Sequence, residues 1–154
     1  MKYLHASLDE LEVGTKLKPK PDYESHWGQT DFYYALERYR PEHMLSHKES
    51  VFICSSAEDL DNCIGGEYIF EIIPDQRIEK HDLNWSTEVS CLICDNAPEE
   101  KIKEAALKYW HAIPHENESL WEYLTPSATI KKVHKYEDYQ DIDEVEKIKK
   151  KIKL

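Results

Sequence analysis

Three short apolar motifs, each holding polar side chains, most constrain how this chain can fold. They read YLHAS at residues 3–7, SVFICSS at residues 50–56 and WEYL at residues 121–124. Runs of aromatic and branched residues of this length favour strands. A polar side chain inside such a run costs free energy unless it is paired or used. The motifs therefore predict three strands that together form one functional site, with His5 and Glu122 as its candidate functional side chains.

The composition narrows the class of protein. A chain of 154 residues fits one domain and can bury roughly two thirds of its unfolded surface. The formal charge of −11 argues against a broad basic surface for nucleic acid. No stretch approaches the ~18 apolar residues of a membrane helix, and the amino end lacks a signal-peptide pattern. We expect a cytoplasmic protein with no membrane contact and no extended nucleic-acid surface.

The hydrophobic pattern predicts an order of elements. Strands are expected over residues 2–6, 51–54, 67–73, 121–124 and 128–133, and helices over residues 32–40, 55–61 and 99–110. The helix over 99–110 is the clearest, because its apolar residues form one stripe and two glutamates begin its first turn. Turns are expected at Gly14 and Gly65-Gly66, and a polar loop at residues 18–27.

Two further segments carry expectations about packing. In the strand over 67–73 the residues Tyr68, Phe70 and Ile72 alternate with neighbours that include two glutamates, which predicts one buried face. Residues 136–154 run from acidic to basic, which predicts a charged carboxyl-terminal helix packed on, or extending from, a domain of residues 1–135.

The four cysteines are Cys54, Cys63, Cys91 and Cys94, of which the last two form a Cys-x-x-Cys pair. Such a pair can be half of a zinc site or a redox pair. The surrounding VSCLIC reads instead as a buried strand or packed turn, and no second closely spaced Cys or His pair accompanies it. We expect reduced structural thiols and, because the histidines lack ligand spacing, no metal site.

The order of the motifs resembles the ADP-ribosyltransferase superfamily, especially its small histidine-containing branch of rifampicin ADP-ribosyltransferases and poly(ADP-ribose) polymerase (PARP)-like domains. Those proteins open with His-Gly-Ser or His-Gly-Thr, which is similar to His5-Ala6-Ser7 here. Their glycine before a leucine-x-proline piece is similar to residues 14–19, and their aromatic strand with its helix cap is similar to residues 51–57. Their late Glu-Tyr-Ile is similar to residues 122–124.

The resemblance implies a fold and a function. The fold would be α+β, with two small curved antiparallel sheets, flanking helices and an NAD cleft between the sheets. The function would be transfer of ADP-ribose from NAD, consumed as a substrate, to a protein, nucleic acid or small molecule. Such an enzyme would suit a bacterial or phage effector.

The resemblance also assigns the ligand contacts of the first motif. His5 would hydrogen-bond a ribose hydroxyl of NAD, and the backbone of Ala6 would hold the nicotinamide amide. Ser7 would add a hydroxyl contact. Ala6 stands where the family has glycine, which restricts the backbone at that point.

The other two motifs would supply stacking and catalysis. Phe52 would stack on the nicotinamide, where tyrosine is commoner in the family, and Tyr33 or Tyr34 would supply a second ring. Glu122 would stabilise the oxocarbenium-like transition state that forms when the bond between nicotinamide and ribose breaks. Leu120 stands where the arginine-specific branch has an acidic or amide residue, so arginine is not the expected acceptor.

Two alternatives use the same fold. One is a catalytically silent domain that binds a nucleotide or a partner protein, and the orientation of Glu122 relative to His5 distinguishes it from a transferase. The other is an enzyme similar to RNA 2′-phosphotransferases, which needs basic residues around its cleft. The chain offers only scattered candidates for those, namely Arg38, Arg40 and Lys48.

Overall fold

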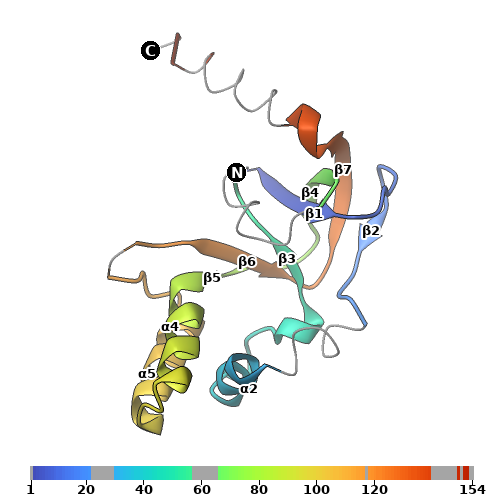
Figure 1. The fold of residues 1–154 in the computed structure, drawn as a ribbon. Helices are drawn as coiled ribbons and strands as arrows, with labels where there is room; N and C mark the ends of the chain where they lie inside the picture. Colours follow the sequence, from blue (N-terminus) through green and yellow to red (C-terminus); the bar gives the residue numbers. More distant parts are fainter. Residues whose placement is uncertain are drawn as a thin grey trace.

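The computed structural model describes residues 2–21, 30–56, 66–116, 118–139, 149 and 151–152. Its elements in chain order are β1 (Tyr3–Ser7), β2 (Lys16–Leu17), α2 (Asp31–Arg38), the 3-10 helix η1 (His47–Glu49), β3 (Val51–Ile53), β4 (Tyr68–Pro74), β5 (Glu79–Asp82), α4 (Leu83–Cys94), α5 (Glu99–Trp110), β6 (Trp121–Thr125) and β7 (Ala128–Lys135). Residues 136–139 add a helical turn after β7. Figure 1 shows α2, α4 and α5 gathered at one end of the molecule, below the strands.

The strands form two antiparallel sheets. The four-stranded sheet has the order β1-β4-β7-β2, and the three-stranded sheet has the order β3-β6-β5. A register shift between Glu71 and Ile72 interrupts the β4-β7 ladder, and such an irregularity bends and twists a strand. The expected mixed α/β architecture with curled antiparallel sheets is confirmed at this level.

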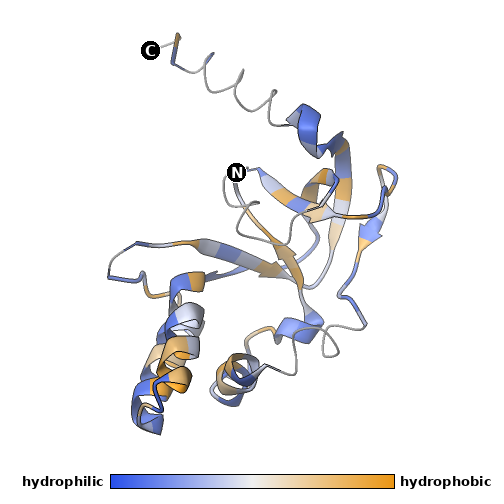
Figure 2. Cartoon of the chain, viewed as in Figure 1, coloured by the Kyte–Doolittle hydropathy of each residue, from blue (hydrophilic) through white to orange (hydrophobic). Residues whose placement is uncertain are grey.

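The two sheets pack against each other through one apolar cluster, called here the inter-sheet cluster. Its buried members are Leu17, Val51, Ile53, Phe70, Ile72, Ala128 and Ile130. Tyr3 and Tyr123 pack at its edge, with their rings in edge-to-face contact. In Figure 2, β3 is orange along its length, as expected for a strand whose three residues are all apolar. Burying each large aliphatic side chain contributes about 1.5–3 kcal/mol to folding.

The expectation that the strand over 67–73 has one buried face is wrong. Both faces of β4 are covered, with Ile69 1% exposed, Phe70 0%, Glu71 8% and Ile72 5%. Phe70 and Ile72 join the inter-sheet cluster, whereas Ile69 packs on the other face with Leu4, Cys54 and Tyr139. Glu71 accepts a hydrogen bond from His134, which allows its carboxylate to be buried. The helical turn over 136–139 thus covers a face that alternation alone leaves open.

A second correction concerns the residues before α5. The expected buried strand or packed turn at Val89–Cys94 is the second half of the twelve-residue helix α4. Trp85 and Val89, four residues apart, are its buried residues and pack against α5. The Asp82 carboxylate caps the start of the helix by accepting a hydrogen bond from the Asn84 backbone N–H. The branched residues of VSCLIC favour a strand and so hide this helix signal in the sequence.

The sequence pattern also does not predict strand β5.

Apart from η1, which was not expected, the remaining described elements agree with the sequence expectations except for small differences in length. The helix over 99–110 is confirmed as α5, and the helix over 32–40 is shorter, ending at Arg38 before Pro41. The larger parts of three predicted segments lie outside the described residues, namely the helix over 55–61, the helix over 136–154 and the loop over 18–27, as do Cys63 and Gly65. Among the described residues, no helix has the length and apolar character needed to cross a membrane.

Two helices end with a residue in the left-handed backbone region. Asn96 has φ 53° after α4, and Ala112 has φ 55° after α5. After α4 the Ala97 N–H donates to the Leu92 carbonyl (2.9 Å) and the Asn96 N–H to the Ile93 carbonyl (3.1 Å), and the same pair of bonds closes α5. This is the Schellman ending, whose left-handed residue is usually glycine.

Replacing Ala112 with glycine should therefore stabilise the protein. Alanine in the left-handed region is strained by its Cβ, and glycine removes that strain at the cost of greater freedom in the unfolded chain. We expect Ala112→Gly to raise the free energy of unfolding by about 0.5–1 kcal/mol in a urea titration. The matched control, Asn96→Gly, should change less because asparagine tolerates this conformation. Lower stability in the Ala112 variant would contradict the assignment.

Candidate functional site

The three sequence motifs lie on three neighbouring strands. Outside the two sheet ladders, β1 meets β3 at one bridge, where the Leu4 N–H donates to the Cys54 carbonyl (2.8 Å) and the Cys54 N–H to the Leu4 carbonyl (3.0 Å). Strand β3 then pairs with β6. The order β1, β3, β6 places the segments that contain His5, Phe52 and Glu122 side by side. We call the meeting of β1 and β3 the seam.

His5 adds a side-chain bond to the seam. Its Nδ1 lies 2.7 Å from the carbonyl oxygen of Phe52, and its ring stacks on Phe70, the residue opposite it on β4. Burial lowers the pKa of His5 and outweighs the opposite effect of this hydrogen bond. At neutral pH the ring is therefore uncharged. Since a carbonyl can only accept, Nδ1 carries the proton and Nε2 has the lone pair.

The next two residues of β1 lie in different surroundings. Ala6 packs on the outer face of the four-stranded sheet, in the cluster of Leu4 and Tyr139. Ser7 Oγ accepts from the Asp9 backbone N–H at 3.1 Å. A Cβ on Gly66 would clash with the Ser7 backbone, so the chain before β4 approaches the end of β1 as only glycine allows.

The aromatic residues of the predicted site gather around His47. Phe52 stacks on the His47 ring with centroids 6.0 Å apart, and Tyr33 contacts the same ring at 5.9 Å. Tyr34 contacts Tyr33 edge-to-face but is itself 54% exposed. The structure thus brings Phe52, Tyr33 and Tyr34 together, with a histidine of this chain against the Phe52 ring.

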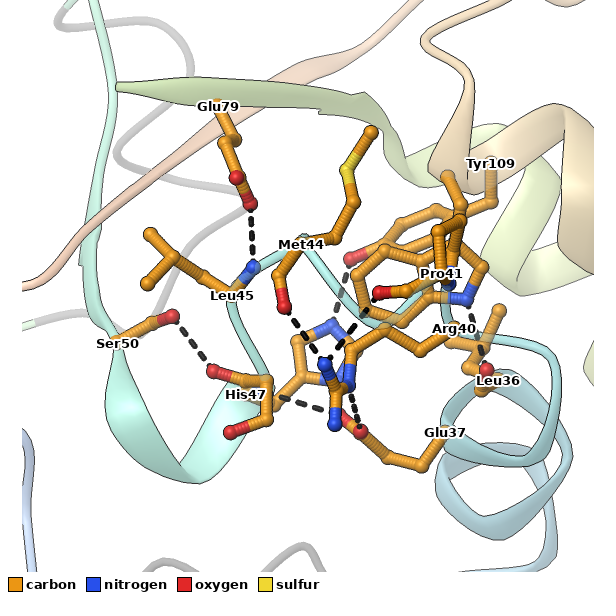
Figure 3. A network of polar contacts seen from close by, with 12 residues as sticks. Leu36, Glu37, Arg40, Pro41, Met44, Leu45, His47, Ser50, Glu79 and Tyr109 are labelled. Carbon is orange, nitrogen blue, oxygen red and sulfur yellow. Dashed lines mark hydrogen bonds and ion pairs between the residues drawn. The ribbon is translucent and has the colours of Figure 1, made fainter. Parts of the chain in front are cut away.

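Figure 3 shows the polar network around His47. Its Nε2 lies 2.7 Å from the Tyr109 hydroxyl, and its Nδ1 lies 3.0 Å from the Glu37 carboxylate. The His47 backbone N–H donates to the same carboxylate at 2.9 Å, and the Arg40 guanidinium donates to it as well. Burial favours the protonated acid, but these contacts outweigh it and lower the pKa of Glu37. A charged network therefore ties η1 to α2 and α5.

His81 lies beside this network and is 0% exposed. Its ring stacks on Tyr109 at 4.5 Å, and its Nδ1 lies 2.9 Å from the Tyr109 carbonyl. Its Nε2 has no hydrogen-bond partner among the described residues. Desolvation, together with the repulsion from His47, lowers the pKa of His81 to about 4. His81 is thus a neutral histidine that resists protonation.

Glu122 lies on the helix-covered face of the three-stranded sheet. Across the β5-β6 ladder Glu122 lies opposite His81, which packs on α5. Across the β3-β6 ladder Leu124, two residues after Glu122, lies opposite Phe52. Tyr123, between them, packs instead on the inter-sheet cluster. Because side chains alternate along a strand, Glu122 and Phe52 share one face as diagonal neighbours, whereas His5 lies on the inter-sheet face.

Asp82 fixes the start of β6, where Glu122 lies. Its buried carboxylate accepts from the backbone N–H groups of Asn84 (3.0 Å), His115 (2.8 Å) and Leu120 (3.1 Å). Burial favours the protonated acid, but these hydrogen bonds outweigh it and hold the pKa of Asp82 below its usual range. One side chain thus joins β5, the start of α4 and the residue before β6.

Sequence reasoning missed His47, His81 and Tyr109. The two histidines belong to a set that shows no ligand spacing, and each packs against Tyr109 of α5, which is far from both in the sequence. No local sequence signal marks them. Among the described residues, no group of three metal-ligating side chains is present.

A hollow of about 400 Å³ lies elsewhere, between the start of α2 and the end of α4. It is lined by Thr30, Asp31, Phe32, Ser90, Ile93 and Cys94. None of the residues predicted for the site lines it.

Comparisons with known proteins give no match, either to a protein-family model or to a curated protein. The resemblance to ADP-ribosyltransferases therefore depends on the three motifs and on where the structure places them.

His81 should make the protein less stable in mild acid. An unfolded histidine accepts a proton near pH 6.5, whereas folded His81 does so only near pH 4, so stability present above pH 6.5 is lost as the pH falls towards 4. The full loss from this residue is roughly 3 kcal/mol. Urea titrations across this range should show a shallower fall for His81→Phe than for wild type. The exposed control His111→Gln should keep the wild-type slope, and equal slopes for wild type and His81→Phe would contradict the assignment.

Proposed function

We propose that this chain binds NAD at the seam and transfers its ADP-ribosyl group to an acceptor, releasing nicotinamide. The observation that carries the proposal is the side-by-side order of β1, β3 and β6, which brings together three motifs that are far apart in the sequence. A curled pair of antiparallel sheets is also the architecture that the resemblance implies.

His5 suits the role of a ribose contact. Its Nδ1–H is held by the Phe52 carbonyl, so the unprotonated Nε2 can accept a hydrogen bond from a ribose hydroxyl. The lowered pKa keeps that lone pair available at neutral pH.

Phe52 and Glu122 supply the second half of the proposed site. They share a face of the three-stranded sheet, so a ring and a carboxylate lie within reach of one ligand. In the reaction the bond between C1′ of the ribose and the nicotinamide nitrogen breaks, and nicotinamide leaves with the electron pair. The acceptor forms a bond to C1′ and loses its proton to solvent. The transferase requires the Glu122 carboxylate to stabilise the positive charge that develops on the ribose, although Glu122 and His5 lie on opposite faces of their strands.

The second candidate is a silent domain that binds a nucleotide or a partner without transfer. His5 lies on the inter-sheet face, whereas Glu122 lies on the helix-covered face of the three-stranded sheet. This placement favours the silent domain. A carboxylate directed away from the ribose contact would not stabilise the reacting centre.

The test compares wild type with Glu122→Gln, using labelled NAD, a cell lysate and separate detection of nicotinamide. Removing one preorganised charge should lower both nicotinamide release and labelling by about 10²–10³. Glu104→Gln, on the exposed side of α5, is the matched control and should keep full activity.

Binding of NAD, measured by calorimetry, separates the two candidates. NAD binding with Glu122-dependent release of nicotinamide supports the transferase. NAD binding without release identifies the silent domain. If the folded protein does not bind NAD, the proposed transferase is wrong.

A further inference from the structure

Two of the cysteines form an exposed pair on the last turn of α4. Cys91 and Cys94 are both free and exposed. Cys54 differs, since it is 1% exposed and its thiol lies 3.8 Å from the Leu4 carbonyl as a weak donor. The described part of the chain therefore separates two accessible thiols from one protected thiol, and access governs thiol reactivity.

The spacing of the pair suits a covalent link. Residues three apart on a helix lie on the same face, with Cα atoms about 5 Å apart, which is within the 4.4–6.8 Å of observed disulfides. Their Cβ atoms are about 5–6 Å apart, whereas a disulfide needs about 3.5–4.5 Å. Closing the link requires the last turn to tighten by about 1–2 Å.

The end of α4 is a place where such tightening is feasible. Cys94 is the last helical residue, and the backbone leaves the helix through Asp95 and Asn96. Terminal turns often convert to the tighter 3-10 form. The fully buried residues of α4, Trp85 and Val89, lie in earlier turns, and Leu92 and Ile93 of the last turn are only partly buried against the same cluster.

We propose that Cys91 and Cys94 form a reversible intramolecular disulfide by exchange with a low-molecular-weight disulfide such as oxidised glutathione. One cysteine thiolate attacks a glutathione sulfur, the glutathione S–S bond breaks, and one glutathione leaves as a thiolate that takes up a proton. The second cysteine thiolate then attacks the mixed disulfide and releases the other glutathione. The two cysteines are oxidised by two electrons, and the glutathione disulfide is reduced by the same two.

The surroundings favour a reversible modification. The strain of the tightened turn and its exposure make the bond easy to reduce. No third metal-ligating side chain joins the pair among the described residues, so the thiols have no complete metal site there.

Peptide mapping of the full chain tests this site directly. Trypsin places Cys91 and Cys94 together in residues 81–101, and Cys54 in residues 49–77. After incubation with oxidised glutathione and acid quenching, the mass of the 81–101 peptide should be lower than that of the reduced peptide by two hydrogen atoms. The peptide should resist alkylation, and treatment with dithiothreitol should restore both thiols. Cys91→Ser and Cys94→Ser should instead stop at a glutathione adduct on the remaining thiol. Circular dichroism confirms that each variant is folded.

Several results would overturn the inference. In one, wild type accumulates glutathione adducts at Cys91 or Cys94 without closing. In another, either residue links to Cys63 or to a second chain. In a third, both thiols stay fully alkylatable while a small-molecule dithiol in the same buffer is oxidised.

Discussion

The seam between β1 and β3 is the contact on which the arrangement of this protein depends. Two backbone hydrogen bonds join Leu4 to Cys54, and the His5 side chain adds a third bond, to the Phe52 carbonyl. Because the ladder is limited to this single bridge, the two sheets can curl towards each other and enclose the inter-sheet cluster. His5 is thus both a structural link and the candidate ligand contact, and its neutral state suits both roles.

The helix-covered face of the three-stranded sheet depends on charged groups as much as on apolar packing. The Asp82 carboxylate fixes the start of β6 through backbone hydrogen bonds, and the Glu37 carboxylate holds η1 through the backbone N–H of His47. A buried carboxylate is stable only while its oxygens are satisfied. Phe52 and Glu122 are therefore positioned by groups that belong to neither motif.

The sequence predicts elements best where a single periodicity is sustained. Residues 99–110 show one apolar stripe after Pro98, and α5 follows that stripe. The prediction of a strand or turn at the end of α4 was wrong because Val89 and Ile93 are branched residues that favour strands. The helix start at Asp82 is the signal that indicates a helix instead. Strand β5 has the charged sequence EKHD, which gives no alternation of apolar residues, and only pairing with β6 makes it a strand.

The sequence predicts that the candidate site is formed by three strands. It does not predict the face of the sheet on which each side chain of the site lies. The three motifs indicated strands that share a site, and they are neighbours. The face on which each side chain lies depends on register, and a shift of one residue would reverse it. Nothing in the sequence indicates that His47 lies against Phe52, because that contact depends on the packing of α2 and α5.

The proposed NAD site lies at the seam. NMR can follow the backbone amide shifts of the isotopically labelled full chain during a titration with NAD. Binding at the seam should give saturable shifts at Ala6, Phe52 and Glu122, with smaller changes at the far end of α4. Shifts confined to the hollow between α2 and α4, or no shifts at saturating NAD, would contradict it.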